Sequence, residues 1–126
     1  MKYAILIFEN AEQVQGLRPE QFEECMREHR ALRADLGPGR LVSTAALHDV
    51  TTAQSVLSSE TSRTVMDGPF AETKEVLMGF YVCEFDSLDD AISFGKKIPI
   101  LDEGTVEIRP VLWVDPDMHC DQSADV

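Results

Sequence analysis

The chain has 126 residues, 44% of them apolar, which suits one globular domain with a single core. Its formal net charge is -12, from 23 acidic and 11 basic residues, and the basic residues are scattered. Nucleic acids and membranes are therefore not expected partners, because phosphate surfaces need clustered Lys and Arg and a membrane helix needs roughly 20 apolar residues in a row.

The first half of the chain predicts a strand and a helix. Residues 2–8 are apolar on both faces, and a strand of this kind lies in the middle of its sheet. A polar connector at residues 9–18 leads to Pro19, which is suited to the first turn of a helix. Apolar side chains then recur every three or four residues, the pattern of an amphipathic helix: Phe22, Cys25, Met26, His29, Leu32 and Leu36.

The remaining chain predicts five strands, at residues 40–47, 52–57, 63–66, 79–85 and 105–113. The polar turn at residues 58–62 joins two of them in a hairpin. Ser87 begins a second helix, in a sequence that resembles a capping box, and this helix ends at Pro99. Residues 115–126 are acidic and poor in large apolar groups, so we expect a domain at residues 1–114 followed by a flexible tail.

This order of elements, with an extra hairpin, is the split βαβ or ferredoxin-like plan of an α+β fold. Its two helices can cover one face of the sheet, whereas the strands at residues 2–8 and 79–85 are apolar on both faces. A large uncovered apolar surface usually marks an interface. We therefore expect two copies to pair face to face, as a homodimer.

The most distinctive string is DGPFAETKE at residues 67–75, which is followed by Gly79-Phe80-Tyr81. Asp67 and Gly68 favour a turn, because Asp bonds the backbone ahead of it and Gly permits a positive φ. The string resembles the signature of the YCII-related family, specifically the branch called DGPF proteins. The resemblance extends from the opening strand to residues 106–110.

The resemblance implies a dimeric α+β barrel with a cleft near the motif. Some YCII relatives are lyases that act on chlorinated aromatic compounds, with a His on the first helix and an Asp on the next strand as the proposed acid–base pair. His29 lies on the first predicted helix, but residues 41–46 contain no Asp, so this pair is absent. Most DGPF proteins have no assigned activity, and some are encoded with or fused to extracytoplasmic-function sigma factors. The resemblance therefore predicts the fold better than it predicts the function.

His29 and Asp67 are the candidate catalytic residues. His29 lies on the apolar stripe of its helix, so it is either a general acid–base group in a partly buried cleft or a hydrogen-bonded core histidine. Asp67 forms the turn, and a second role in ligand binding stays open.

Six further side chains are candidate ligand-binding residues: Tyr3, Phe70, Glu72, Lys74, Tyr81 and Arg109. The three aromatic ones, with Phe80, would line a cleft for a ring-shaped ligand or belong to the core. Lys74 would hold an anion, or pair with Glu72 or Glu75 at the surface. Arg109 should point away from the helices, where a buried guanidinium needs an acceptor. This acceptor would be Glu84, Asp67, a carboxylate of the partner subunit or a ligand anion.

No metal ion or cofactor is expected, since the three histidines lie on different elements and no phosphate loop or dinucleotide glycine pattern is present. The three cysteines are widely spaced and favour a reducing compartment, hence the cytoplasm. Two functions stay open. The first is a cofactor-free lyase or isomerase acting on a small organic substrate, and the second is a non-catalytic ligand-sensing or sigma-factor-associated module.

Overall fold

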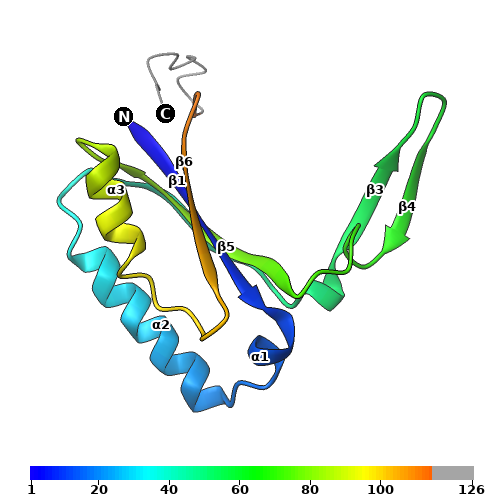
Figure 1. Ribbon diagram of the computed structural model, residues 1–126, viewed down its shortest axis with the longest axis horizontal. Coiled ribbons are helices and arrows are strands. Elements are labelled where there is room, and N and C mark those ends of the chain that lie inside the picture. The colour runs from blue at the N-terminus through cyan, green and yellow to red at the C-terminus, as the bar shows by residue number, and fades with distance from the viewer. Residues whose placement is uncertain (115–126) are drawn as a thin grey trace.

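The computed structural model describes residues 1–114, and the tail predicted for residues 115–126 lies outside the described residues. The elements follow the predicted order, with two short helices added (Figure 1). They are β1 (Lys2–Asn10), α1 (Ala11–Gln15), α2 (Pro19–Ala34), β2 (Leu41–Ala46), η1 (Val50–Thr52), β3 (Gln54–Ser58), β4 (Arg63–Asp67), β5 (Glu75–Glu84), α3 (Leu88–Gly95) and β6 (Thr105–Pro110).

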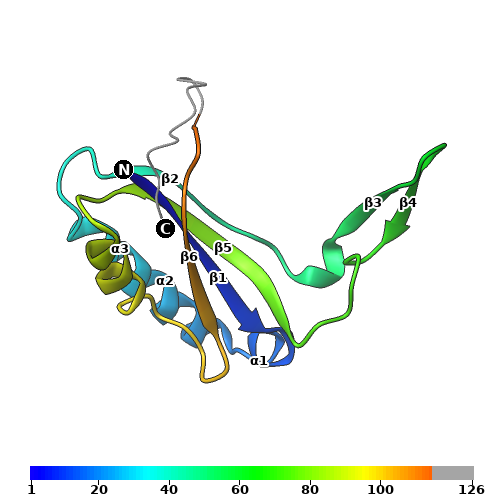
Figure 2. The same ribbon diagram turned by 45° about the horizontal axis from the view of Figure 1, so that its top comes forward.

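Four strands form an antiparallel sheet in the order β2-β5-β1-β6, and β3 and β4 form a separate hairpin. This is the strand order of the ferredoxin-like split βαβ, which confirms the predicted α+β fold class. β1 and β5 are the two central strands, as their two apolar faces predicted. α2 and α3 lie on one side of the sheet, whereas the hairpin extends away from it on the other side (Figures 1 and 2).

The core lies between the helices and one face of the sheet. Alternate residues of β1 and β5 point into it, and Ile5 and Cys83 have no exposed surface. α3 packs closely on β6, since a Cβ atom at Gly95 would lie 2.9 Å from Cδ1 of Ile108. The buried cluster consists of Tyr3, Ile5, Ile7, Leu32, Tyr81, Cys83, Phe85, Ala91, Phe94 and Ile98.

Side-chain caps fix where the helices begin. The Oγ of Ser87 accepts from the amide of Asp90 at 3.1 Å, which confirms the predicted start of α3. The Oδ1 of Asn10 accepts from the amide of Gln13 at 3.0 Å and starts α1, a helix in the segment that was predicted to be a connector. None of the helices in residues 1–114 is long and apolar enough to cross a membrane.

The structure moves several predicted boundaries and exposes one side chain that was predicted to be buried. β5 begins at Glu75, four residues early, because β1 runs on to Asn10 and pairs with it. α3 ends at Gly95, before the predicted Pro99, and β6 ends at Pro110. Phe22 was predicted to lie on the buried stripe of α2 but is 52% exposed. The one buried residue of that helix is Leu32, which lies in its C-terminal half.

Candidate functional site

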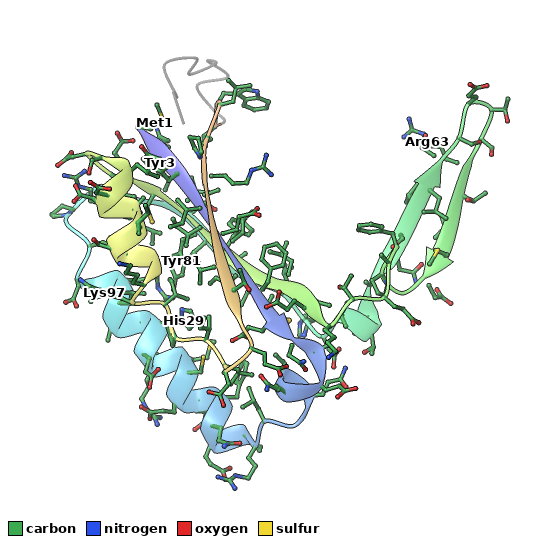
Figure 3. All side chains as sticks on the ribbon, in the orientation of Figure 1. Met1, Tyr3, His29, Arg63, Tyr81 and Lys97 are labelled. Carbon is green, nitrogen blue, oxygen red and sulfur yellow. The ribbon has the colours of Figure 1, made fainter. Side chains whose placement is uncertain are left out.

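His29 lies on the side of α2 that faces the sheet and meets Tyr81 of β5 (Figure 3). Its Nδ1 atom is 2.7 Å from Oη of Tyr81, and the two rings stack with centroids 5.9 Å apart. Arg33, one helical turn after His29, donates from Nη1 to the same hydroxyl at 3.3 Å. These three residues are called the His29 cluster below.

The contact between Tyr81 and His29 allows two tautomers of the neutral ring, because a phenol hydroxyl can donate its proton and also accept hydrogen bonds. In the first tautomer, Tyr81 donates to His29. A guanidinium can only donate, so the oxygen of Tyr81 accepts from Arg33, and its own proton is free to go to Nδ1 of His29. Neutral His29 then holds its proton on Nε2. No hydrogen-bond partner of Nε2 is found among residues 1–114, so in this tautomer the Nε2–H group is a free donor.

The surroundings of His29 keep its ring neutral. Burial lowers the pKa of His29 below its ordinary value, and the positive charge of Arg33 lowers that pKa further. Tyr81 is 2% exposed, and burial raises the pKa of its hydroxyl while Arg33 works in the opposite direction. The cluster therefore presents a neutral imidazole and a neutral phenol beside one cation at pH 7.

Arg33 is half-buried and forms no ion pair with any carboxylate of residues 1–114. Its hydrogen bond to a neutral hydroxyl uses one of its five N–H donors. A guanidinium fork with free donors matches the planar geometry of a carboxylate. The free donors of Arg33 are therefore chemically suited to an organic anion.

Two pockets flank α2. One, of about 260 Å³, opens between α2 and α3 above the apolar side chains of Leu32 and Phe94, with Lys97 and the ion pair of Arg40 and Asp86 in its lining. Phe94 also contacts Tyr81 edge to face, with centroids 5.4 Å apart, so this pocket begins one side chain away from the cluster.

The second pocket, of about 210 Å³, lies between the N-terminal half of α2 and residues 99–101. Its lining includes Cys25 and three carboxylates, of which Glu9 accepts from the amide of Leu101 at 3.1 Å. Burial raises the pKa of Glu9. Within residues 1–114, no three His, Cys, Asp or Glu side chains are arranged to hold a metal ion.

The aromatic residues predicted to share a cleft lie in three different places. Tyr3 and Tyr81 are buried on the helix side of the sheet, where Tyr3 contacts Phe85. Phe80 precedes Tyr81 in β5 and points to the opposite face. Phe70 is 80% exposed beside the hairpin. One chain alone therefore does not bring these rings together.

Asp67 lies at the end of β4, at the base of the hairpin. Its Oδ1 accepts from Nε2 of Gln54 at 2.6 Å, and the next residue, Gly68, has a φ of 89° and donates its amide to the carbonyl of Ala53 at 2.7 Å. The Asp67 side chain thus bonds the side chain of Gln54 across the hairpin, and not the backbone ahead of it as predicted. The hairpin lies apart from α2 in Figures 1 and 3, so Asp67 does not meet His29 within one chain.

The charged candidates are on the surface. Glu72 and Lys74 are exposed, and Lys74 forms no ion pair within the described part of the chain. Arg109 is exposed on the face of β6 turned away from the helices, the side that its strand pattern predicted. Glu84, one of its suggested partners, instead binds the N-terminal ammonium at 2.6 Å.

Sequence reasoning missed Arg33. The available signal was its spacing, because residues four apart on a helix share a face and His29 was already a candidate. Nothing in the local pattern marks the sheet residue that both side chains contact, since Tyr81 is separated from Arg33 by 48 residues.

The chain resembles known proteins along almost its full length. A family model for the YCII-related domain matches residues 1–115. Among curated proteins, the chain is 35% identical over 119 residues to the uncharacterized protein R00369 of Rhizobium meliloti (strain 1021), an alignment that covers 92% of this chain and 96% of the relative. These matches concern the whole domain, and neither description specifies a substrate.

Proposed function

Because the chain belongs to the YCII-related domain family, we propose that it is a small-molecule pocket protein that carries out cofactor-free acid–base chemistry of the lyase or isomerase type. We also propose, from the resemblance of the string at residues 67–75, that the chain belongs to the DGPF branch of that family. The observation that carries the proposal is the contact of His29 with Tyr81 and Arg33.

The cluster is suited to a substrate that becomes negatively charged during the reaction. Neutral His29 would donate from Nε2 to a carbonyl oxygen of the substrate, and this hydrogen bond strengthens as water takes the proton from the neighbouring carbon and charge develops on the oxygen. Arg33 would hold a carboxylate of the substrate and stabilise the same charge. Lyases and isomerases of small organic acids share this enolate-type step.

Substrate binding can also make His29 a base. A substrate can select the second tautomer of neutral His29, which is reached by proton exchange with water and in which Nδ1–H donates a hydrogen bond to the oxygen of Tyr81. Nε2 then presents its lone pair to the substrate. His29 would thus change from a donor to a proton acceptor through its tautomer, without a neighbouring aspartate.

We further propose that the working unit is a homodimer. The sheet face opposite the helices, here called the open face, carries Ala4, Leu6, Phe8, Phe80 and Val82, all of them half-exposed in one chain. Pairing of two open faces would remove this apolar surface from water.

The test is an NMR titration of the His29 ring nitrogens, with and without a panel of small aromatic and aliphatic carboxylates. The proposal expects a neutral ring protonated on Nε2 in the free protein and nitrogen shifts that change when a carboxylate binds. Arg33→Gln should abolish the response, whereas Arg30→Gln, at an exposed position of the same helix, should leave it intact. A folded protein whose His29 signals ignore every compound would contradict the acid–base proposal.

The second candidate is a non-catalytic ligand-sensing module, a role that includes association with a sigma factor. The pocket of about 260 Å³ favours it, because its apolar floor and charged rim suit a small ligand and His29 is not part of its lining. Ligands that shift the signals of Leu32 and Phe94 and leave His29 unchanged would support this module and count against the enzyme.

A further inference from the structure

The hairpin of β3 and β4, residues 54–67, is called the arm here. Its two strands pair with each other and with no other strand of residues 1–114. Figures 1 and 2 show it reaching out from the body of the protein. A two-stranded hairpin by itself is at best marginally stable in water, so an arm of this kind needs a surface to pack against.

The arm exposes apolar side chains on both of its faces. Val56 and Val65 form a directly opposed pair and are 63% and 67% exposed. Leu57 and Met66 point to the other face and are also exposed. An exposed apolar patch of this kind on a protein usually marks a contact with another macromolecule.

The base of the arm is fixed by the residues of the sequence motif. Besides the bond between Gln54 and Asp67, the Oγ of Ser55 donates to the carbonyl of Gly68 at 2.7 Å, and the positive φ of Gly68 suits glycine. These bonds join the two ends of the arm to each other, so its strands are already paired at the base before it meets a partner, which lowers the entropic cost of binding.

Charge and position favour a second copy of this chain as that partner. Two chains of net charge -12 repel each other, so their contact must lie where charge is low or balanced. The arm contains one basic and two acidic residues, Arg63, Glu60 and Asp67, which leaves a net charge of -1. The open face is apolar at its centre and lies on the same side of the sheet as the arm (Figures 1 and 2).

We propose that the arm is an intersubunit arm, which packs against the open-face side of a second copy, and that the motif at residues 67–70 is its root. In a two-fold dimer each copy contributes one arm and receives one. The valine pair of the arm is then covered by the partner. This role extends the proposed homodimer and does not depend on the acid–base chemistry of His29.

The first test replaces the valine pair with charge. Val56→Asp with Val65→Asp should weaken dimerisation at least about tenfold in sedimentation, because a buried unpaired carboxylate costs far more than an exposed one. Phe22→Asp introduces the same charge at an exposed apolar position of α2 and should leave dimerisation unchanged. Circular dichroism confirms that each variant is folded. A wild-type chain that stays monomeric, or an arm variant that dimerises like the wild type, overturns the proposal.

The second test needs no destabilising substitution. A photo-crosslinking amino acid replaces Val65, and chains labelled with ¹⁴N and ¹⁵N are mixed before irradiation. We expect crosslinked peptides of mixed isotope content that join the arm to β1, β5 or β6. Crosslinks confined to one chain, or to a different protein, would overturn the assignment of a second copy. The His29 titration is read separately, so failure of the arm and failure of the acid–base proposal are distinguishable.

Discussion

The hydroxyl of Tyr81 lies 2.7 Å from Nδ1 of His29, and this contact orients a side chain of helix α2 through a buried residue of strand β5. Tyr81 is held by the core, where Phe94 contacts its ring edge to face. The orientation of His29 therefore depends on the packing of α2 and α3 on the sheet, and not on the loops around it.

Removing the positive charge of Arg33 should raise the pKa of His29. Arg33 disfavours the charged imidazolium, so in Arg33→Gln only burial continues to lower that pKa. The measurement is an NMR titration of the His29 ring. Arg30→Gln removes an equal charge that does not contribute to the shift, and an equal response to both substitutions would contradict the role given to Arg33.

His29 should also make the stability of the protein depend on pH. Its folded pKa is depressed, so the unfolded chain binds the proton more readily, and the stability that neutral His29 contributes is present above the unfolded value of 6.5 and lost as pH falls through the folded value. We expect the difference in unfolding free energy between wild type and His29→Gln to shrink on acidification from about pH 8 to 5. Urea unfolding at a series of pH values measures it. A constant difference would contradict a depressed folded pKa.

The substitution Tyr81→Phe should cost about 1–2 kcal/mol of unfolding free energy, because it leaves Nδ1 of His29 and one donor of Arg33 without their partner. Tyr3→Phe is the matched control, since Tyr3 is also buried and its hydroxyl has no hydrogen-bond partner within residues 1–114. Urea unfolding of both variants decides the point. Equal losses would show that the hydroxyl of Tyr81 contributes nothing beyond its ring.

The sequence patterns predicted the sheet because its signals are local. Two apolar faces marked β1 and β5 as central strands, and Ser87 with Asp90 three residues later marked the start of α3. The short helix α1 has an equally local cap at Asn10, but its five residues are too few to show an apolar stripe.

The candidate site could be predicted only in part, because a site depends on contacts between distant segments. The stripe on α2 indicated that His29 faces the sheet, but nothing local pairs it with Tyr81, 52 residues away. The motif string indicated a turn at Asp67, and that turn exists. The base of the hairpin is closed by the bonds of Gly68 with Ala53 and Ser55, which no sequence periodicity indicates.

The close packing of α3 on β6 makes Gly95 sensitive to a single methyl group. Gly95→Ala would place a Cβ atom 2.9 Å from Cδ1 of Ile108, so the end of that side chain must shift away from its rotamer, at a cost of about 0.5–1.5 kcal/mol. Gly37→Ala meets only the side chain of Arg40, at 3.6 Å, and should be nearly neutral. Thermal and urea unfolding would test both, and a wild-type stability for Gly95→Ala would mean that α3 packs less tightly than described.

The two described cysteines should differ sharply in reactivity. Burial raises the pKa of Cys83 to about 11, and its side chain has no exposed surface, so both its thiolate fraction and its access are very low. Burial and the nearby charges of Glu9 and Glu28 also raise the pKa of Cys25, but Cys25 is half-exposed. With iodoacetamide at about pH 8, we expect Cys25 to be alkylated in the folded protein and Cys83 only at the rate at which the sheet opens.

Peptide mapping by mass spectrometry separates the two sites, and a urea-unfolded sample, in which both should react alike, is the control. Equally fast labelling of Cys83 in the folded protein would mean that β1 and β5 open together far more often than their central position implies.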